Sequence, residues 1–186
     1  MFTALDPAIR RYRLTVDDVE RMVESGILGA DARVELVEGE LVAVSPQGPE
    51  HASGKGVLAE LLQRAFGGSA WVRNQDPLRC GEHSLPEPDL AVVRGRPRDY
   101  MQRHPRGDEA ILVVEISRTS QRLDRRKAAV YAEAGVPEYW LIDLVARCVT
   151  VHREPGADGY AQTRAIDESG ELELADGSRC SVRDLL

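Results

Sequence analysis

The amino-acid sequence predicts a single α/β domain built around a mixed β-sheet. Two observations lead to this prediction. Segments with apolar residues at helical spacing alternate along the chain with short segments of strand-like pattern, an order typical of α/β domains. Residues 111–116, ILVVEI, are almost wholly apolar, as expected of a strand that is covered on both faces of its sheet. We find no internal repeat and no linker long enough to divide the 186 residues into two domains.

The first two predicted elements are a helix and a hairpin. Thr15 is a good N-cap, and the apolar residues after it recur on one face, which predicts a short amphipathic helix ending near Gly26. Residues 33–46 alternate in two runs around Glu38 and Gly39, a pattern typical of a β-hairpin.

A longer helix and two strands are expected next. Apolar residues at helical spacing predict a helix over residues 51–66, which two glycines close. Residues 70–80 and 88–93 have the composition of strands, and residues 94–108 form a polar loop rich in arginine.

The second half of the chain continues the alternation of strands and helices. We expect the buried strand at 111–116, a helix over 120–134, and paired strands at 138–144 and 148–154. From residue 159 onward the pattern predicts a small C-terminal β extension that ends in a short helix near Val182.

Charge and cysteine usage limit the classes of protein. The net charge of −7 argues against a protein that coats nucleic acid without specificity. Residues 94–127, however, carry ten basic and five acidic side chains, a local excess of five positive charges that could meet a phosphate backbone or simply be solvated. The three cysteines have no metal-type spacing, and no apolar run reaches the ~20 residues of a membrane span or resembles a signal peptide. We therefore expect a cytoplasmic protein.

Two acidic residues lie at the ends of predicted strands. Asp89 opens one strand directly after Pro88, and Glu115 closes the buried strand. An unpaired carboxylate inside an apolar strand is costly, so Glu115 needs an exposed strand end or a compensating partner. If the strands are neighbours, both carboxylates meet at one edge of the sheet, where such hard oxygen ligands suit Mg²⁺. The alternatives are a turn-capping role for Asp89 and a salt bridge for Glu115.

A lysine in the following helix is a third candidate. Ser117 shares the strand face of Glu115, and a lysine in its place would complete Asp…Glu-x-Lys, the pattern of metal-dependent phosphodiesterases. The helix supplies Lys127, one of two lysines among 24 basic residues. Its compact ammonium differs chemically from the guanidinium that the chain otherwise prefers. The alternative is a surface lysine that pairs with Asp124 or packs against Tyr131.

Four segments together resemble a known family. They are RVELVEGELVAVSP, QDPLRCGEHSLPEPDLAVV, ILVVEIS and LDRRKAAVYAEAGVPEYWLID, within roughly Leu14 to Val151. This combination resembles the Uma-two family (putative restriction endonucleases) of the PD-(D/E)XK nuclease superfamily. The resemblance implies a restriction-endonuclease-like mixed sheet flanked by helices, and a metal-dependent endonuclease that hydrolyses phosphodiester bonds in DNA.

The resemblance also implies roles for site residues. Asp89 and Glu115 match the metal ligands, with the Ile116 carbonyl as a further ligand of Mg²⁺, for which Mn²⁺ could substitute. Lys127 matches a lysine that has moved to the following helix, and Glu35 matches an additional acidic residue. The cation would polarise a phosphodiester and acidify a water. Lys127 would orient that water or stabilise developing charge, and Glu35 would position a second metal, a water or Lys127.

Several neighbouring residues keep more than one interpretation. Glu35 could equally be a surface acid of its hairpin, and His51 could cap a helix, contact phosphate or be a structural or exposed histidine. Gln75 lies in a motif that the family shares, without an assigned role. Candidates to hold the phosphate backbone are Arg118, Arg122, Arg125 and Arg126.

Two other functions compete with a DNA endonuclease. The first is a catalytically inactive nuclease fold that binds nucleic acid or a protein partner, which Ser117 in place of the usual lysine favours. The second is a structural dimer module that uses edge strands of the C-terminal extension. A homodimer is also expected for an active enzyme, because compact nucleases of this fold often pair to address two strands.

Overall fold

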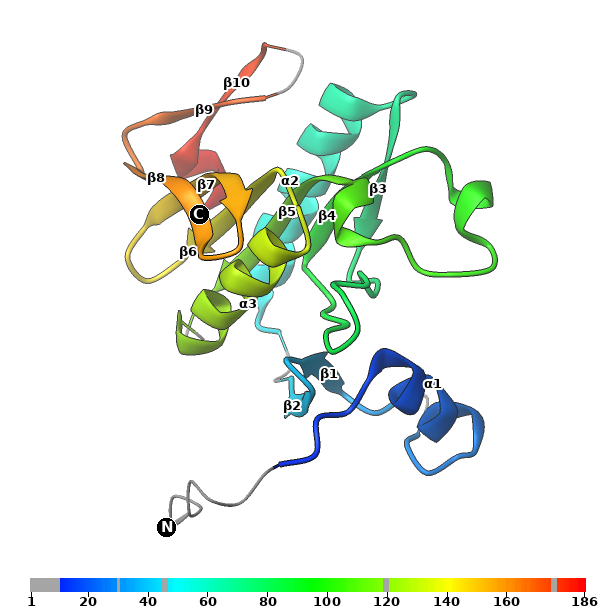
Figure 1. Cartoon of the computed structure of the whole chain (residues 1–186). Helices are drawn as coiled ribbons and strands as arrows, with labels where there is room; N and C mark the ends of the chain where they lie inside the picture. Colours follow the sequence, from blue (N-terminus) through cyan, green and yellow to red (C-terminus); the bar gives the residue numbers. More distant parts are fainter. Residues whose placement is uncertain (1–10, 30, 45–46, 119–120, 175–176) are drawn as a thin grey trace.

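The centre of the protein is a mixed β-sheet. Figure 1 shows the computed structural model, which describes residues 11–29, 31–44, 47–118, 121–174 and 177–186. Within these residues a six-stranded sheet has the order β3-β4-β5-β6-β7-β8. Only β5 and β6 run parallel, and the other neighbouring pairs are antiparallel. The strands are β3 (Ala70–Asn74), β4 (Leu90–Arg94), β5 (Ala110–Ser117), β6 (Glu138–Asp143), β7 (Cys148–Gly156) and β8 (Gly159–Asp167).

Helices and two small hairpins surround this sheet. The α-helices are α1 (Val16–Glu24), α2 (Pro49–Phe66) and α3 (Gln121–Glu133). Short 3₁₀ helices span Pro97–Tyr100, Gly107–Glu109 and Val182–Leu185. The hairpins pair β1 (Val34–Val37) with β2 (Glu40–Ala43), and β9 (Glu171–Glu173) with β10 (Arg179–Ser181). In the described residues no helix is long and apolar enough to cross a membrane. The predicted mixed sheet flanked by helices is therefore confirmed.

The two faces of the sheet belong to two separate apolar clusters. Leu90 and Val92 of β4 pack with the α2 side, whereas the alternate residues Ala91 and Val93 pack with the α3 side. This alternation is the ordinary consequence of the two-residue period of a strand. The central strands β4 and β5 are thus buried on both faces, which explains why β5 is apolar along nearly its whole length.

The N-terminal elements form as their local sequence predicts. The side chain of Thr15 accepts a hydrogen bond from the Asp18 amide at 3.1 Å, and the Asp18 carboxylate returns the bond to the Thr15 amide at 2.9 Å. Such a capping box satisfies two amides at the helix start. Glu38 and Gly39 have φ values of 51° and 82°, the conformation that a two-residue hairpin turn requires.

Three boundaries differ from the expectation. β8 pairs with β7 along both strands and so belongs to the main sheet, which leaves only β9 and β10 as a small separate extension. Residues 75–80 leave the sheet after β3, because Gln75 adopts a φ of 52° that an extended strand does not allow. The predicted helix start at residue 120 lies outside the described residues, and α3 is seen from Gln121.

Candidate active site

The pairing of β4 with β5 brings the two strand-end acids together. Leu90 lies opposite Val114 in this antiparallel ladder, so Asp89 and Glu115 occupy the next opposed positions. Both residues are buried, with exposed fractions of 5% and 6%. They line the same cavity of about 530 Å³, as the sequence led us to expect of acids at neighbouring strand ends.

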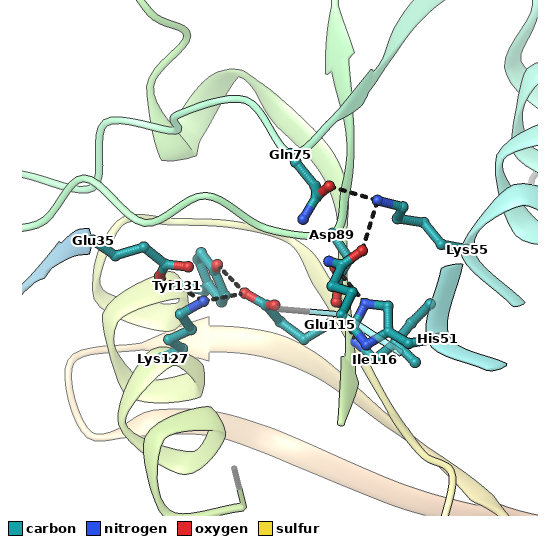
Figure 2. A network of polar contacts seen from close by, with 10 residues as sticks. Glu35, His51, Lys55, Gln75, Asp89, Glu115, Ile116, Lys127 and Tyr131 are labelled. Carbon is teal, nitrogen blue, oxygen red and sulfur yellow. Dashed lines mark hydrogen bonds and ion pairs between the residues drawn. The ribbon is translucent and has the colours of Figure 1, made fainter. Parts of the chain in front are cut away.

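Lys127 lies inside this site rather than on the surface of α3. Its exposed fraction is 4%, and its Nζ lies 2.9 Å from Glu115 Oε1 and 2.6 Å from Glu35 Oε2 (Figure 2). The Tyr131 hydroxyl, one helical turn later, donates to Glu115 Oε1 at 2.7 Å. The expected metal is therefore not the sole compensation for Glu115, because an ammonium and a phenol contact it directly.

The pKa shifts in this cluster follow from burial and charge. Burial raises the pKa of Glu115 above its ordinary value; the Lys127 ammonium opposes this rise, and the charges of Asp89 and Glu35 add to it. Burial would favour a neutral Lys127, but the carboxylates of Glu115 and Glu35 outweigh it and raise the pKa of the ammonium. The two carboxylates thus favour the protonated, ammonium form of Lys127.

Glu35 reaches the site from the β1–β2 hairpin. Its exposed fraction of 5% excludes a surface strand acid, and its neighbours Leu36 and Val37 are buried as well. Arg126 holds the hairpin against α3, with contacts of 2.7 Å to Glu38 and 3.2 Å to Glu40. These ion pairs keep Glu35 beside Lys127.

A second group of side chains surrounds Asp89 on the side of α2. His51 Nε2 lies 2.7 Å and Gln47 Nε2 2.8 Å from Asp89 Oδ1, while the backbone N–H of Ile116 donates to Asp89 Oδ2 at 2.8 Å. The interpretations left open for His51 did not include this contact with the Asp89 carboxylate. Gln47 is a site residue that the sequence analysis missed.

Lys55 is the second site residue that the sequence analysis missed. It lies one helical turn after His51, and its Nζ donates to Gln75 Oε1 at 2.6 Å (Figure 2). The same Nζ donates to Gln47 Oε1 at 3.1 Å. Both lysines of the chain are therefore buried at this site. Their rarity among 24 basic residues was a signal that pointed to Lys55 as much as to Lys127.

The arginines proposed to hold a phosphate backbone differ in their surroundings. Arg118 is exposed at the cavity, where it pairs with the exposed Glu50 at 3.0 Å. Arg125 is exposed on α3, whereas Arg126 is engaged by the hairpin. The side chain of Arg122 lies outside the described part of the structure.

The donor atoms at the cavity suit a hard divalent cation. No group of three or more histidine, cysteine, aspartate or glutamate side chains in the described residues is placed to hold a metal ion. Mg²⁺, however, commonly takes only one or two carboxylates and keeps several waters. Asp89 and Glu115 supply two carboxylates, and the Ile116 carbonyl belongs to a residue that lines the same cavity. Burial is the main cause of the raised pKa of Glu115, and repulsion from Asp89 adds to it; a cation between the two acids would relieve this repulsion.

We predict that Lys127→Met destabilises the fold by about 3–5 kcal/mol, the range for a buried ion pair that loses one partner. The change leaves Glu35 and Glu115 buried without their ammonium. Denaturant unfolding at neutral pH measures the effect, with Arg125→Met on the exposed face of α3 as the control. Adding Glu35→Gln to Lys127→Met should restore part of the loss. Equal stability of Lys127→Met and wild type would show that the cluster contributes nothing to folding.

The comparisons with known proteins agree with the fold just described. A family model described as "Uma2: Putative restriction endonuclease" matches residues 16–182. The crystal structure of a putative nuclease belonging to DUF820 from Anabaena variabilis matches with a TM-score of 0.73 and 19% identity, over 92% of this chain and 97% of that chain. No curated protein matches the chain. At this identity the structural likeness shows a shared fold, and the family match, which spans most of the sequence, shows that the chain belongs to the Uma2 family of putative restriction endonucleases.

Proposed function

We propose that the protein is a Mg²⁺-dependent endonuclease that hydrolyses phosphodiester bonds in DNA, with Mn²⁺ as a substitute cation. The observation that supports this most directly is the placement of Asp89 opposite Glu115, with a buried ammonium 2.9 Å from Glu115. Membership of a family of putative restriction endonucleases supports the same class of reaction.

Asp89, Glu115 and the Ile116 carbonyl would hold the cation. When bound, it supplies Lewis-acid polarisation of the phosphodiester and lowers the pKa of water. The hydrogen bond from the Ile116 amide fixes the Asp89 carboxylate against β5, so that both acids keep a constant separation. His51 and Gln47 hold the other Asp89 oxygen in the same way. These contacts would keep the Asp89 carboxylate in place before a cation arrives.

Lys127 would act as a proton-bearing donor. An ammonium has three N–H groups; that of Lys127 donates to Glu115 and forms an ion pair with Glu35. The Lys127 ammonium could donate a further hydrogen bond to an acceptor in the cavity, either the attacking water or a phosphate oxygen. Of the three roles considered for Glu35, its 2.6 Å contact supports the positioning of Lys127.

DNA would approach across the open mouth of the cavity. Arg118 lies at this mouth and Arg125 is exposed on α3, so both remain candidates for phosphate contacts. Glu50 would have to release Arg118, which costs little because the pair is exposed. Arg126 has its own partners in the hairpin and is a weaker candidate.

An inactive, nucleic-acid-binding or protein-binding module is the second candidate function. Ser117, buried at 1%, stands where the superfamily pattern has its lysine. The position of Lys127 speaks against this candidate. Its ammonium reaches Glu115 from α3, and so takes the place of the lysine that the superfamily pattern has on the strand.

We predict that Asp89→Asn weakens Mg²⁺ binding and abolishes Mg²⁺-dependent nicking of plasmid DNA. The substitution keeps the shape of the side chain but removes one of the two anionic ligands. Isothermal titration calorimetry measures the affinity, and gel analysis of supercoiled plasmid measures cleavage. Asp158→Asn in the exposed β7–β8 turn is the matched control. Identical Mg²⁺ affinity in wild type and Asp89→Asn would place the cation elsewhere or nowhere.

We predict that Lys127→Arg lowers cleavage by roughly 10²-fold or more, the effect expected when a catalytic group is misplaced. The planar guanidinium cannot take the position of a compact ammonium between two carboxylates. Lys127→Ala should be at least as defective. Cleavage rates are compared at a temperature at which thermal melts show all three proteins folded. Equal rates would end the catalytic assignment of Lys127, and no cleavage by any protein on varied substrates would favour the binding module.

The homodimer remains a prediction. Two copies would present two sites to the two strands of a duplex. Light scattering should return about twice the chain mass of 20.5 kDa. A mass near that of one chain at working concentrations would show a monomer.

A further inference from the structure

Lys55 is a buried ammonium that contacts amide oxygens. Its exposed fraction is 9%, and its hydrogen-bond partners in the described part of the chain are the side chains of Gln47 and Gln75. Burial lowers the pKa of Lys55, while the charge of Asp89 opposes that shift. Neutral amides satisfy its N–H groups but add no negative charge, and the charge of Asp89 acts on the ammonium from nearby.

This ammonium determines the orientation of both amides. An ammonium only donates hydrogen bonds and an ionised carboxylate only accepts them. Gln47 lies between Lys55 and Asp89, so its oxygen must face the lysine and its nitrogen the carboxylate, as observed at 3.1 Å and 2.8 Å. Gln75 also turns its oxygen to Lys55, which directs its NH₂ group away from the lysine (Figure 2).

The backbone of Gln75 adopts an unfavourable conformation at this position. Its φ of 52° lies in the left-handed region, which costs a non-glycine residue conformational free energy. Its backbone N–H donates to the Asp89 carbonyl at 3.3 Å, so it lies directly beside the candidate metal ligand. Its side chain is nevertheless exposed and lines the cavity, so core packing does not account for this conformation.

On the basis of the proposed nuclease function, we propose that Gln75 donates a hydrogen bond from its amide to a phosphate oxygen of bound DNA. Lys55 is then the positioning residue that keeps this amide in the donating orientation. A hydrogen bond to an ionised phosphate is among the stronger ones available to a neutral donor. The charge of Lys55 behind the amide adds attraction for the same anion.

Gln75→Glu separates this role from a structural one. The carboxylate has nearly the shape of the amide and can still accept from Lys55, now as an ion pair, so the fold should be preserved. It has no N–H to donate, however, and it places a negative charge at the proposed phosphate position. Gln63→Glu, on the exposed face of α2, makes the same change in net charge away from the cavity.

Lys55→Met tests the positioning role. Methionine has a similar length, but it leaves the Gln47 and Gln75 oxygens without their donor. We expect weaker DNA binding at a temperature at which thermal melts show the variant folded, because both amides lose the donor that orients them. A purely structural Lys55 would give a lower melting temperature with unchanged affinity of the folded protein.

The measurement is fluorescence anisotropy of a labelled DNA duplex titrated with the full chain, with Ca²⁺ and separately with EDTA, at fixed ionic strength. We expect Gln75→Glu and Lys55→Met each to weaken binding by roughly tenfold or more, and Gln63→Glu to match wild type. Wild-type affinity in both site variants would overturn the inference while leaving the nuclease proposal intact. Failure of wild type itself to bind or cleave DNA would overturn the nuclease proposal, and this inference with it.

Discussion

The arrangement of the site depends on the Lys127 ammonium between Glu35 and Glu115. These three residues come from α3, β1 and β5, and all are nearly inaccessible to solvent. A buried charge is tolerated only with partners, so helix, hairpin and sheet must come together for any of the three to be stable. Lys127 therefore both holds the hairpin to the domain, through Glu35, and contacts Glu115, the second carboxylate of the proposed metal site.

The parts of the fold that depend on local chemistry could be predicted from the sequence. Thr15 caps α1, and the turn at Glu38 and Gly39 forms because its residues accept positive φ. Partnership between distant strands was harder to predict. β8 is largely exposed and alternates without a strong apolar face, so its pattern did not reveal that it extends the main sheet. The local sequence around Gln75 likewise contains no signal that the strand ends there.

Only part of the site could be predicted, again because local signals are visible in the sequence and distant partners are not. Asp89, Glu115 and Lys127 stood out through strand ends, residue rarity and a family resemblance, and the structure places them at one cavity. Lys55 was missed, although Leu58 and Leu62 follow it at helical spacing and so place it on the buried stripe of α2. A lysine on such a stripe needs partners. Those partners could not be predicted, because Gln47 and Gln75 lie in irregular segments that have no periodicity.

The two lysines are neutralised differently, and this difference bears on what the cavity would bind. Lys127 contacts two carboxylates, so its side of the site keeps an excess of negative charge that favours a cation. Lys55 contacts two neutral amides, so its own hydrogen-bond partners add no negative charge on the side near Gln75. Asp89 lies between them, accepting bonds from Gln47 and His51. A cation paired with a phosphate would match this arrangement, with the cation near the carboxylates and the phosphate near the amides. The proposed chemistry therefore requires both lysines, and an arginine would not replace either.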